Sequence, residues 1–345
     1  MSASSGECIL VVQTGFLGDV VLTTPLLQVL RRRFPEAEVT LLVTPAAAPL
    51  MARHPAVDRV EIDDKRGADG GIRGMLAVGR RLRQRRYGLA LAAHKSWRTG
   101  ALLLLARIPR RIGFTSAPAA PLYTERVPRP PALHDRDRLL QLMRPFGELG
   151  AAPRPWISVD EDARRQALEL LATARASGRP VAAICPGSVW RTKRWPAPAY
   201  GGLVRHLEAA GYACVLLGSP AERALTRMVN DAAGGGAIDL GGATDLSVLA
   251  AVLAETQVVV SNDSAPMHLA TAVGVPQVAI FCATVPGQGY GPLGECVQIV
   301  EKDLACRPCG RHGAERCPRA TDDCMELIRV EDVAAAVERV RALAA

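Results

Sequence analysis

Four side chains of this sequence have the chemistry needed to act on a phosphorylated ligand: Asp19, Lys193, Asp263 and His268. Each follows a short apolar run of the kind that forms a buried strand. A carboxylate serves as a general base, whereas an ammonium group stabilises developing negative charge. Ligands of open α/β sheets bind beyond the carboxyl ends of the strands, so these positions predict a binding site.

The stretch CPGSVWRTKRWP places a hydroxyl group and several basic side chains on one loop. Gly187 and Ser188 directly follow an apolar run, and Lys193 is flanked by Arg191 and Arg194. Backbone N–H groups, a hydroxyl and a cation suit phosphate oxygens. The pattern G-x-x-x-x-G-K-[ST] of a P-loop is absent, so the loop predicts a phosphate contact of a different kind.

The stretch SNDSAPMH predicts a helix whose N-terminus faces an anion. Either Asp263 or Ser264 can cap this helix, and Pro266 is a residue favoured in a first turn. A helix N-terminus presents N–H groups without intrahelical partners at the positive end of the helix dipole. His268 lies in the same turn, which makes it a better candidate for a ligand contact than a lone core histidine. The stretch therefore predicts a diphosphate site.

Asp19 and Glu222 each allow a structural role and a chemical one. Asp19 follows Gly15 and Gly18, which predict a tight turn, and it either caps a helix or acts as a base. Glu222 follows Gly218 in LLGSPAE, and it either compensates a helix dipole or accepts hydrogen bonds from sugar hydroxyls. The first stretch lacks the G-x-G-x-x-G fingerprint, which argues against a dinucleotide.

Short apolar runs alternate with helical stretches along the whole chain, which predicts parallel sheets covered by helices on both faces. The Pro-rich stretch 128–157 predicts the connection between two domains. We therefore expect two doubly wound α/β domains, residues 1–155 and 156–330. Residues 331–345 are expected to form a closing helix.

The charge of the chain is unevenly distributed. Residues 1–150 hold 23 Lys and Arg against 13 Asp and Glu, whereas the remainder holds 19 against 21. A basic first half predicts an acidic partner, or else a solvated arginine face. Basic residues interleaved with aromatic ones are absent, so we expect no nucleic acid. No apolar run approaches the roughly 18 residues of a membrane span, and the start has no signal-peptide pattern, which predicts a cytoplasmic protein.

Cys306, Cys309, Cys317 and Cys324 are spaced C-x2-C-x7-C-x6-C near the C-terminus. Four thiolates on short loops can bind zinc, although the second pair lacks the tight spacing of a zinc ribbon. Reduced thiols in a loop are the alternative, and we favour it.

These stretches, in this order, resemble glycosyltransferase family 9, the ADP-heptose:lipopolysaccharide heptosyltransferases, and in particular the heptosyltransferase II type. The resemblance covers nearly the whole chain and rests on GDVVLTTPLLQVLRRRFPEAEV, LALAAHKSWRTGALLLLARIPRRIGF, CPGSVWRTKRWP, VLLGSPAE, VVVSNDSAPMHLATAVGVPQVAIF and the tail from CRPCG to CMELIRVEDVAAAV. It implies a GT-B fold, in which an N-terminal acceptor domain and a C-terminal nucleotide-sugar domain face a central cleft.

The resemblance also implies roles for individual residues. Asp19 resembles the general base that deprotonates the acceptor, and Lys193 resembles the lysine that neutralises the leaving diphosphate. Glu222 resembles the residue that contacts the nucleoside or its ribose. The turn that contains Asp263, Ser264 and His268 is similar to the donor-binding turn between a strand and a helix. The other substrate-binding residues that it implies are Thr14, Gly18, Gly187, Ser188, Gly218 and Met267.

The chain departs from the family pattern at three positions. Thr14 and Phe16 differ from the commonest residues of the leading loop, and Ala265 replaces the glycine of NDSG. These differences affect acceptor and sugar preference rather than the class of enzyme.

The implied partners are a sugar-nucleotide donor and an acidic lipopolysaccharide core acceptor at the inner membrane surface, where the protein could bind peripherally. No Asp-x-Asp motif of the kind that chelates Mg²⁺ ends a strand, so we expect no required cofactor. Two alternatives stay open: a family 9 transferase that uses another sugar nucleotide, and a nucleotide-sugar epimerase with the same fold.

Overall fold

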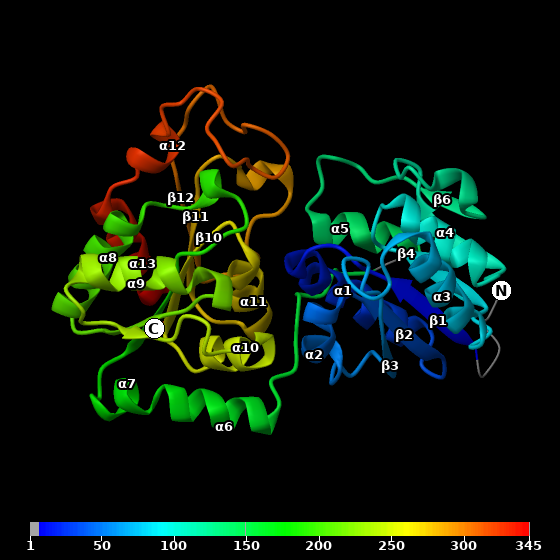
Figure 1. Cartoon of the computed structure of the whole chain (residues 1–345), viewed down its shortest axis with the longest axis horizontal. Helices are drawn as coiled ribbons and strands as arrows, with labels where there is room; N and C mark the ends of the chain where they lie inside the picture. The colour runs from blue at the N-terminus through cyan, green and yellow to red at the C-terminus, as the bar shows by residue number, and fades with distance from the viewer. Residues whose placement is uncertain (1–6, 149, 345) are drawn as a thin grey trace. The chain divides into compact units, whose positions relative to one another are not determined.

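The computed structural model describes residues 7–148 and 150–344. The chain forms two compact units, Met1–Ser158 and Val159–Ala345, each of which is described by itself (Figure 1). The sequence places the division at residue 155 and separates the last helix. In the structure that helix, α13 (Val330–Ala344), packs within the second unit against α8 (Ala197–Ala209).

The first unit contains a six-stranded parallel sheet in the order β3-β2-β1-β4-β5-β6. Its strands are β1 (Cys8–Val12), β2 (Glu38–Val43), β3 (Arg59–Ile62), β4 (Leu89–Ala92), β5 (Arg110–Phe114) and β6 (Glu125–Val127). Its helices are α1 (Leu17–Arg33), α2 (Ala48–Met51), α3 (Gly71–Arg83), α4 (Trp97–Leu105) and α5 (Asp135–Leu140), with short 3₁₀ turns η1 (Pro45–Ala47), η2 (Ala120–Leu122) and η3 (Gln141–Phe146).

The second unit repeats this plan with the strand order β12-β11-β10-β7-β8-β9. Its strands are β7 (Val181–Cys185), β8 (Ala213–Leu216), β9 (Ile238–Asp239), β10 (Val258–Asn262), β11 (Gln277–Phe281) and β12 (Val297–Glu301). Besides α8 and α13, its helices are α6 (Glu161–Leu170), α7 (Ala172–Ala176), α9 (Arg223–Ala233), α10 (Leu246–Ala254), α11 (Ala265–Val273) and α12 (Asp323–Glu326), with 3₁₀ turns η4 (Arg191–Lys193), η5 (Pro220–Glu222) and η6 (Pro286–Gln288).

Both sheets are doubly wound, as the sequence predicts. All strands are parallel, but the order in which they are added to each sheet reverses beside its first strand. This switch point lies between β1 and β4 in the first unit and between β7 and β10 in the second. In such sheets the loops at the carboxyl ends of these two strands diverge and leave room for a ligand. The fold therefore provides one ligand-binding edge in each unit.

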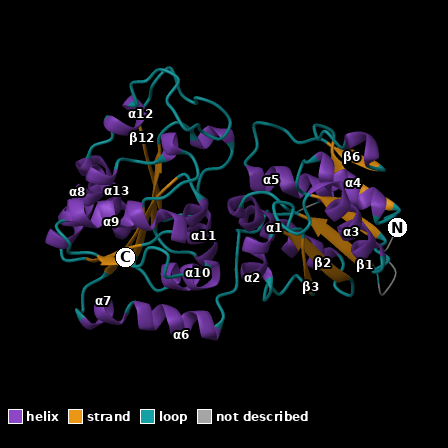
Figure 2. Cartoon of the chain, in the orientation of Figure 1, coloured by secondary structure: helices purple, strands orange, loops and turns teal. Residues whose placement is uncertain are grey.

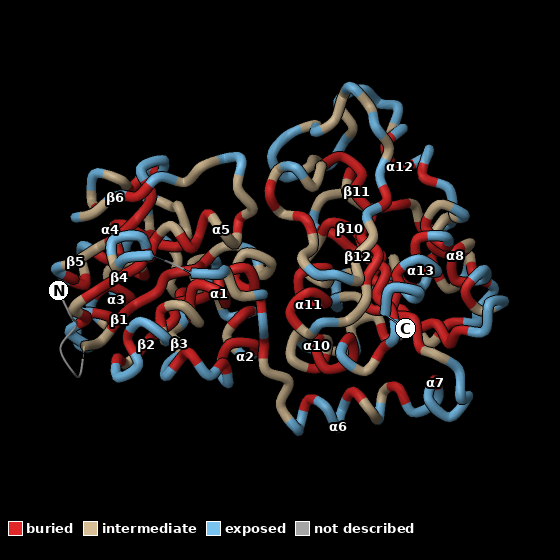
Figure 3. Tube along the Cα trace, turned by 180° about the vertical axis from the view of Figure 1, so that it is seen from behind, coloured by how far each residue is buried: buried red, intermediate tan, exposed pale blue. Residues whose placement is uncertain are grey.

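The central strands are buried because both faces of each sheet are covered. Every residue of β7 and β10 is buried, which explains why β7 is a continuous apolar run and why β10 is one until Ser261. Figure 3 shows the burial of β10. In the second unit α8, α9 and α13 cover one face of the sheet, and α10 and α11 cover the other (Figure 2). Helix α8 ends at Ala209, shortly before Gly211, which has a φ of 91° that glycine adopts without strain.

Candidate active site

Asn262 joins the two loops that leave the switch point of the second sheet. Its side chain is fully buried, and its amide nitrogen donates to the carbonyl oxygen of Pro186 at 2.8 Å. Its amide oxygen accepts from the backbone nitrogen of Trp195 at 3.0 Å. Because Trp195 itself is buried, this side chain fixes the loop after β7 relative to the end of β10.

Lys193 and Asp263 form an ion pair at this point. Lys193 Nζ lies 2.5 Å from Asp263 Oδ2, and the two side chains are 14% and 7% exposed. The hydroxyl of Thr284, which follows β11, donates to the same carboxylate oxygen at 2.6 Å. Three loops that are far apart in sequence thus converge on one carboxylate.

The 3₁₀ turn η4, which carries Lys193, is anchored on both sides. The backbone nitrogen of Thr192 donates to the carbonyl of Ala314 at 3.1 Å, and the backbone nitrogen of Ala314 donates to the hydroxyl of Thr192 at 2.9 Å. The backbone nitrogen of Ala283 donates to the carbonyl of Thr192 at 3.2 Å. The segment between Cys306 and Cys324 therefore supports the turn that carries Lys193.

Arg307 is a buried side chain that binds the backbone at the end of β11 and in the loop after it. Its guanidinium is 3% exposed and donates to the carbonyl oxygens of Thr284 at 2.7 Å and Phe281 at 3.0 Å, and also binds the carboxylate of Glu301. Because Thr284 donates to Asp263, Arg307 holds in place a residue that contacts the ion pair.

Helix α11 begins directly after Asp263. Ser264 occupies the N-cap position with an extended backbone, but its side chain makes no capping hydrogen bond and instead donates to the carbonyl of Asn262 at 3.3 Å. The first N–H groups of a helix have no partners within it, so this end offers hydrogen-bond donors to an anion. Met267 and His268 lie in the first turn and are buried.

Glu222 lies in η5, the 3₁₀ turn that follows β8. Its carboxylate accepts from the backbone nitrogen and from the hydroxyl of Ser219, both at 2.8 Å, so Glu222 completes a capping box, a structural role different from the predicted compensation of the helix dipole. The same carboxylate contacts the loop after β7, because a Cβ atom added to Gly187 would lie 2.0 Å from Glu222 Oε1. Gly218 also lies against Glu222, and Ser188 on the adjoining loop is buried.

Asp19 belongs to the first unit, where it lies in the first turn of α1. Its Oδ2 accepts from the backbone nitrogen of Phe16 at 3.0 Å, so Asp19 does cap this helix. A Cβ atom on Gly15 would lie 2.7 Å from the same oxygen, which explains the glycine. Gly18 is different from our expectation: it lies inside α1 and not in the turn.

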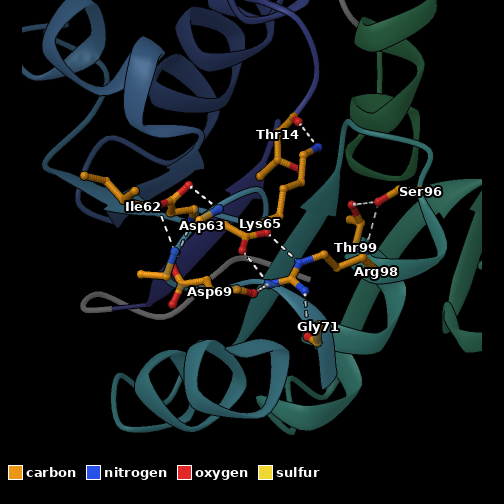
Figure 4. A network of polar contacts seen from close by, with 12 residues as sticks. Thr14, Ile62, Asp63, Lys65, Asp69, Gly71, Ser96, Arg98 and Thr99 are labelled. Carbon is orange, nitrogen blue, oxygen red and sulfur yellow. Dashed lines mark hydrogen bonds and ion pairs between the residues drawn. The ribbon is translucent and has the colours of Figure 1, made fainter. Parts of the chain in front are cut away.

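Thr14, which precedes this turn, is held by two other loops of the first sheet. Its hydroxyl lies 3.0 Å from Nδ1 of His94 after β4, and its carbonyl accepts from the ammonium of Lys65 after β3 (Figure 4). Burial, together with the charge of Lys65, lowers the pKa of His94 to about 4, so this ring is neutral near pH 7. Burial also lowers the pKa of Lys65.

The structure therefore groups the predicted residues in two sets. The second unit gathers Lys193, Asp263, Ser264, Met267, His268, Gly187, Ser188, Gly218 and Glu222 around the ends of β7, β8 and β10. The first unit places Thr14, Gly18 and Asp19 together after β1. Sequence reasoning missed Asn262, Thr284 and Arg307, although Asn262 stands in SNDSAPMH and Arg307 in CRPCG, both of which we quoted.

The four C-terminal cysteines are free thiols in the structure. Cys309 Sγ donates to the carbonyl of Cys306 at 3.4 Å, and Cys324 is buried. Within residues 7–148 and 150–344 no three His, Cys, Asp or Glu side chains are grouped in a way that could hold a metal ion. None of the helices formed by the described residues combines the length and apolar character needed to cross a membrane.

Two doubly wound units, one with an ammonium group and a helix N-terminus at its switch point, are typical of the GT-B fold. Comparison with known proteins gives the family. The chain belongs to glycosyltransferase family 9 (heptosyltransferase), whose family model matches residues 75–317.

Individual relatives agree with this assignment. The chain is 28% identical over 305 residues to lipopolysaccharide heptosyltransferase 2 of Salmonella typhimurium, an alignment that covers 81% of this chain and 83% of that protein. A family 9 glycosyltransferase from Veillonella parvula shares the fold with a TM-score of 0.89 at 24% identity, over 97% of both chains. The E. coli ADP-heptose lipopolysaccharide heptosyltransferase II shares it with a TM-score of 0.81 at 22% identity, over 97% of this chain and 98% of that one.

Proposed function

We propose that this enzyme transfers a heptose from ADP-heptose to the inner core of lipopolysaccharide, with inversion of the anomeric centre. The observation that carries the proposal is the Lys193–Asp263 ion pair beside the N-terminus of α11, because an ammonium group and backbone amides suit a diphosphate. The relatives named above support the choice of heptose and of lipopolysaccharide.

The second unit is the proposed donor-binding unit. Lys193 and the N–H groups of α11 would bind the diphosphate, while Asp263 orients Lys193. Glu222, adjacent to the loop after β7, would accept hydrogen bonds from the ribose or nucleoside. The remaining residues that we assign to this site are Gly187, Ser188, Gly218, Ser264, Met267 and His268.

The first unit is the proposed acceptor-binding unit, with Thr14 and Gly18 beside the general base. Asp19 would take the proton of the acceptor hydroxyl as its oxygen bonds to the anomeric carbon of the heptose. The bond between that carbon and the diphosphate oxygen breaks, and ADP leaves with the electron pair. A single base and no carboxylate nucleophile are what direct inversion requires.

The charge distribution supports the proposed acceptor and location. A first half with an excess of basic residues suits an acceptor that carries acidic sugars and phosphates, at the inner face of the cytoplasmic membrane. We propose a cytoplasmic protein that binds there peripherally, and we assign no role to nucleic acid.

We also propose that transfer needs no metal cofactor, because Lys193 and the N-terminus of α11 supply the positive charge that the leaving diphosphate requires. Transfer should therefore continue in excess EDTA at a rate within about twofold of that with MgCl₂. Loss of transfer in EDTA, with recovery on adding Mg²⁺, would refute this part of the proposal.

The decisive experiment compares wild type with Asp19→Asn, whose amide oxygen can still accept from Phe16. The variant should bind ADP-heptose normally but transfer heptose to a truncated lipopolysaccharide core at least ~100-fold more slowly. A near-normal rate would exclude Asp19 as the base. The wild type should prefer ADP-heptose over UDP- and GDP-sugars; transfer from one of those instead would identify a different donor. Epimerised sugar released without acceptor would identify an epimerase.

A further inference from the structure

A buried ion pair lies at the start of the loop that follows β3. Arg98, in the first turn of α4, donates from Nε and Nη2 to both carboxylate oxygens of Asp63, at 2.9 and 2.6 Å (Figure 4). The side chain of Asp63 is fully buried, and that of Arg98 is 18% exposed. Ser96 caps α4 by accepting from the backbone nitrogen of Thr99 at 3.1 Å, which fixes the helix end where Arg98 begins. A two-pronged charged contact of this kind sets orientation as well as distance.

The same guanidinium also holds the loop that follows β3. Arg98 donates to the carbonyl oxygens of Asp69 at 2.7 Å and of Gly71 at 3.4 Å. Within the loop, the Asp64 carboxylate accepts from two backbone nitrogens at 3.0 Å, and Asp69 Oδ2 accepts from the backbone nitrogen of Asp64 at 2.9 Å. The loop 63–71 is therefore closed on itself and tied at both ends to one arginine of α4.

Lys65 extends from this closed loop to the end of β1. Its ammonium group donates to the carbonyl oxygen of Thr14, 51 positions earlier in the sequence (Figure 4). The side chain is only partly exposed, so the ammonium gives up part of its hydration for this contact. His94 holds the hydroxyl of the same threonine. Thr14 is thus fixed by the loop that follows β3 and the loop that follows β4.

Thr14 in turn begins the short segment that binds Asp19. The backbone nitrogen of Phe16 donates to Asp19 Oδ2 at 3.0 Å, and the Gln13 side chain accepts from Gly15 at 3.2 Å while donating to Thr23 at 3.0 Å. A turn held this closely around a carboxylate transmits a shift of Thr14 to the position of that carboxylate.

We propose that Lys65 is a positioning residue for Asp19, and that the Asp63–Arg98 ion pair orients Lys65 for this role. The inference rests on the proposed function of Asp19 as the general base. Lys65 acts through the Thr14 carbonyl and the turn 14–16, and it holds the carboxylate where the acceptor hydroxyl must lose its proton. Displacing a catalytic group by about 1 Å is enough to slow a reaction by up to about 100-fold.

The experiment uses the full-length enzyme and four variants. Lys65→Met removes the ammonium group and keeps the length of the side chain, whereas Lys65→Arg keeps a donor. Arg98→Met removes the guanidinium that orients Lys65. Arg66→Met is the matched control, because it removes the neighbouring, exposed positive charge from the same loop. Two quantities are measured: steady-state kinetics with both substrates, and hydrogen exchange of the backbone amides of residues 14–19.

Lys65→Met should lower kcat by about 10- to 100-fold while KM for ADP-heptose stays within about twofold. Exchange in residues 14–19 should become faster in Lys65→Met and Arg98→Met, and Lys65→Arg should recover part of both properties. Arg66→Met should change neither.

Two results would overturn the inference. One is unchanged exchange in residues 14–19, which would show that Lys65 does not hold the turn. The other is a rise in KM for the acceptor with kcat unchanged, which would make Lys65 an acceptor contact. Should the wild type transfer no heptose, the proposed function fails, but the exchange measurement still decides whether Lys65 fixes the turn.

Discussion

The ammonium nitrogen of Lys193 lies 2.5 Å from Oδ2 of Asp263, and neither side chain is more than 14% exposed. Each charge therefore depends on the other, because removing one partner from a buried pair leaves an uncompensated charge. An ammonium group has three donors, so a lysine bound to one carboxylate can still donate to phosphate oxygens. The pair is thus a cation held in a fixed place, as a diphosphate site requires.

Lys193→Met should weaken ADP binding by at least about tenfold and slow heptose transfer by at least about 100-fold, because the positive charge beside the leaving diphosphate is lost. Isothermal titration with ADP and initial-rate assays measure the two effects. Lys302→Met is the matched control, since Lys302 lies in the same unit and pairs with Asp332. Equal behaviour of the two variants would remove Lys193 from the donor site.

Thr284→Val should reduce transfer by about tenfold, because the variant keeps the shape of the side chain but loses the hydroxyl that donates to Asp263 at 2.6 Å. A hydrogen bond to a charged group contributes about 1.5–3 kcal/mol. Thr284→Ser keeps the hydroxyl and should retain most of the activity. Indistinguishable rates for the valine and serine variants would show that this hydrogen bond does not matter for transfer.

The sequence predicts the parts of this molecule that have a local signature. The continuous apolar strands and the polar residues at strand ends predict two doubly wound units and a site at their carboxyl edges. Lys193 and Asp263, 70 positions apart, are expected in one site because the ends of parallel strands share an edge, and in the structure they form an ion pair.

The residues that sequence reasoning missed act through contacts that are distant along the chain. Asn262 joins loops 67 or more positions away, and Arg307 reaches carbonyl oxygens of β11 and the loop after it. Lys65 binds Thr14 across 51 positions. No spacing rule connects such residues, because their partners are backbone atoms whose positions only the folded sheet defines. The pair Gly15 and Gly18 predicts a tight turn after the first strand, whereas α1 already begins at Leu17 and includes Gly18.

Gly187→Ala should displace Glu222, because the added Cβ atom would lie 2.0 Å from its Oε1. If Glu222 contacts the nucleoside, ADP should bind about tenfold more weakly, whereas pyrophosphate, which lacks the nucleoside, should bind almost as well. Gly287→Ala is the control, since its added Cβ atom meets nothing within 4 Å. An equal loss of affinity for ADP and pyrophosphate would place Glu222 at the phosphates instead.

The stability of the first unit should fall as the pH drops from about 6.5 towards 4, in part because of His54. Burial lowers the pKa of His54 to about 4, from the ordinary histidine value of about 6.5. The unfolded chain therefore binds the proton first, and acidification favours unfolding by at most about 3 kcal/mol. His54→Asn can keep the acceptor for Ala56 but cannot titrate, so urea unfolding should depend less on pH. His94, with a pKa also lowered to about 4, leaves some dependence. His206→Asn, which changes an exposed histidine, is the control and should leave the pH dependence of urea unfolding unchanged. If the free energy of unfolding depended on pH equally in wild type and His54→Asn, this account would be contradicted.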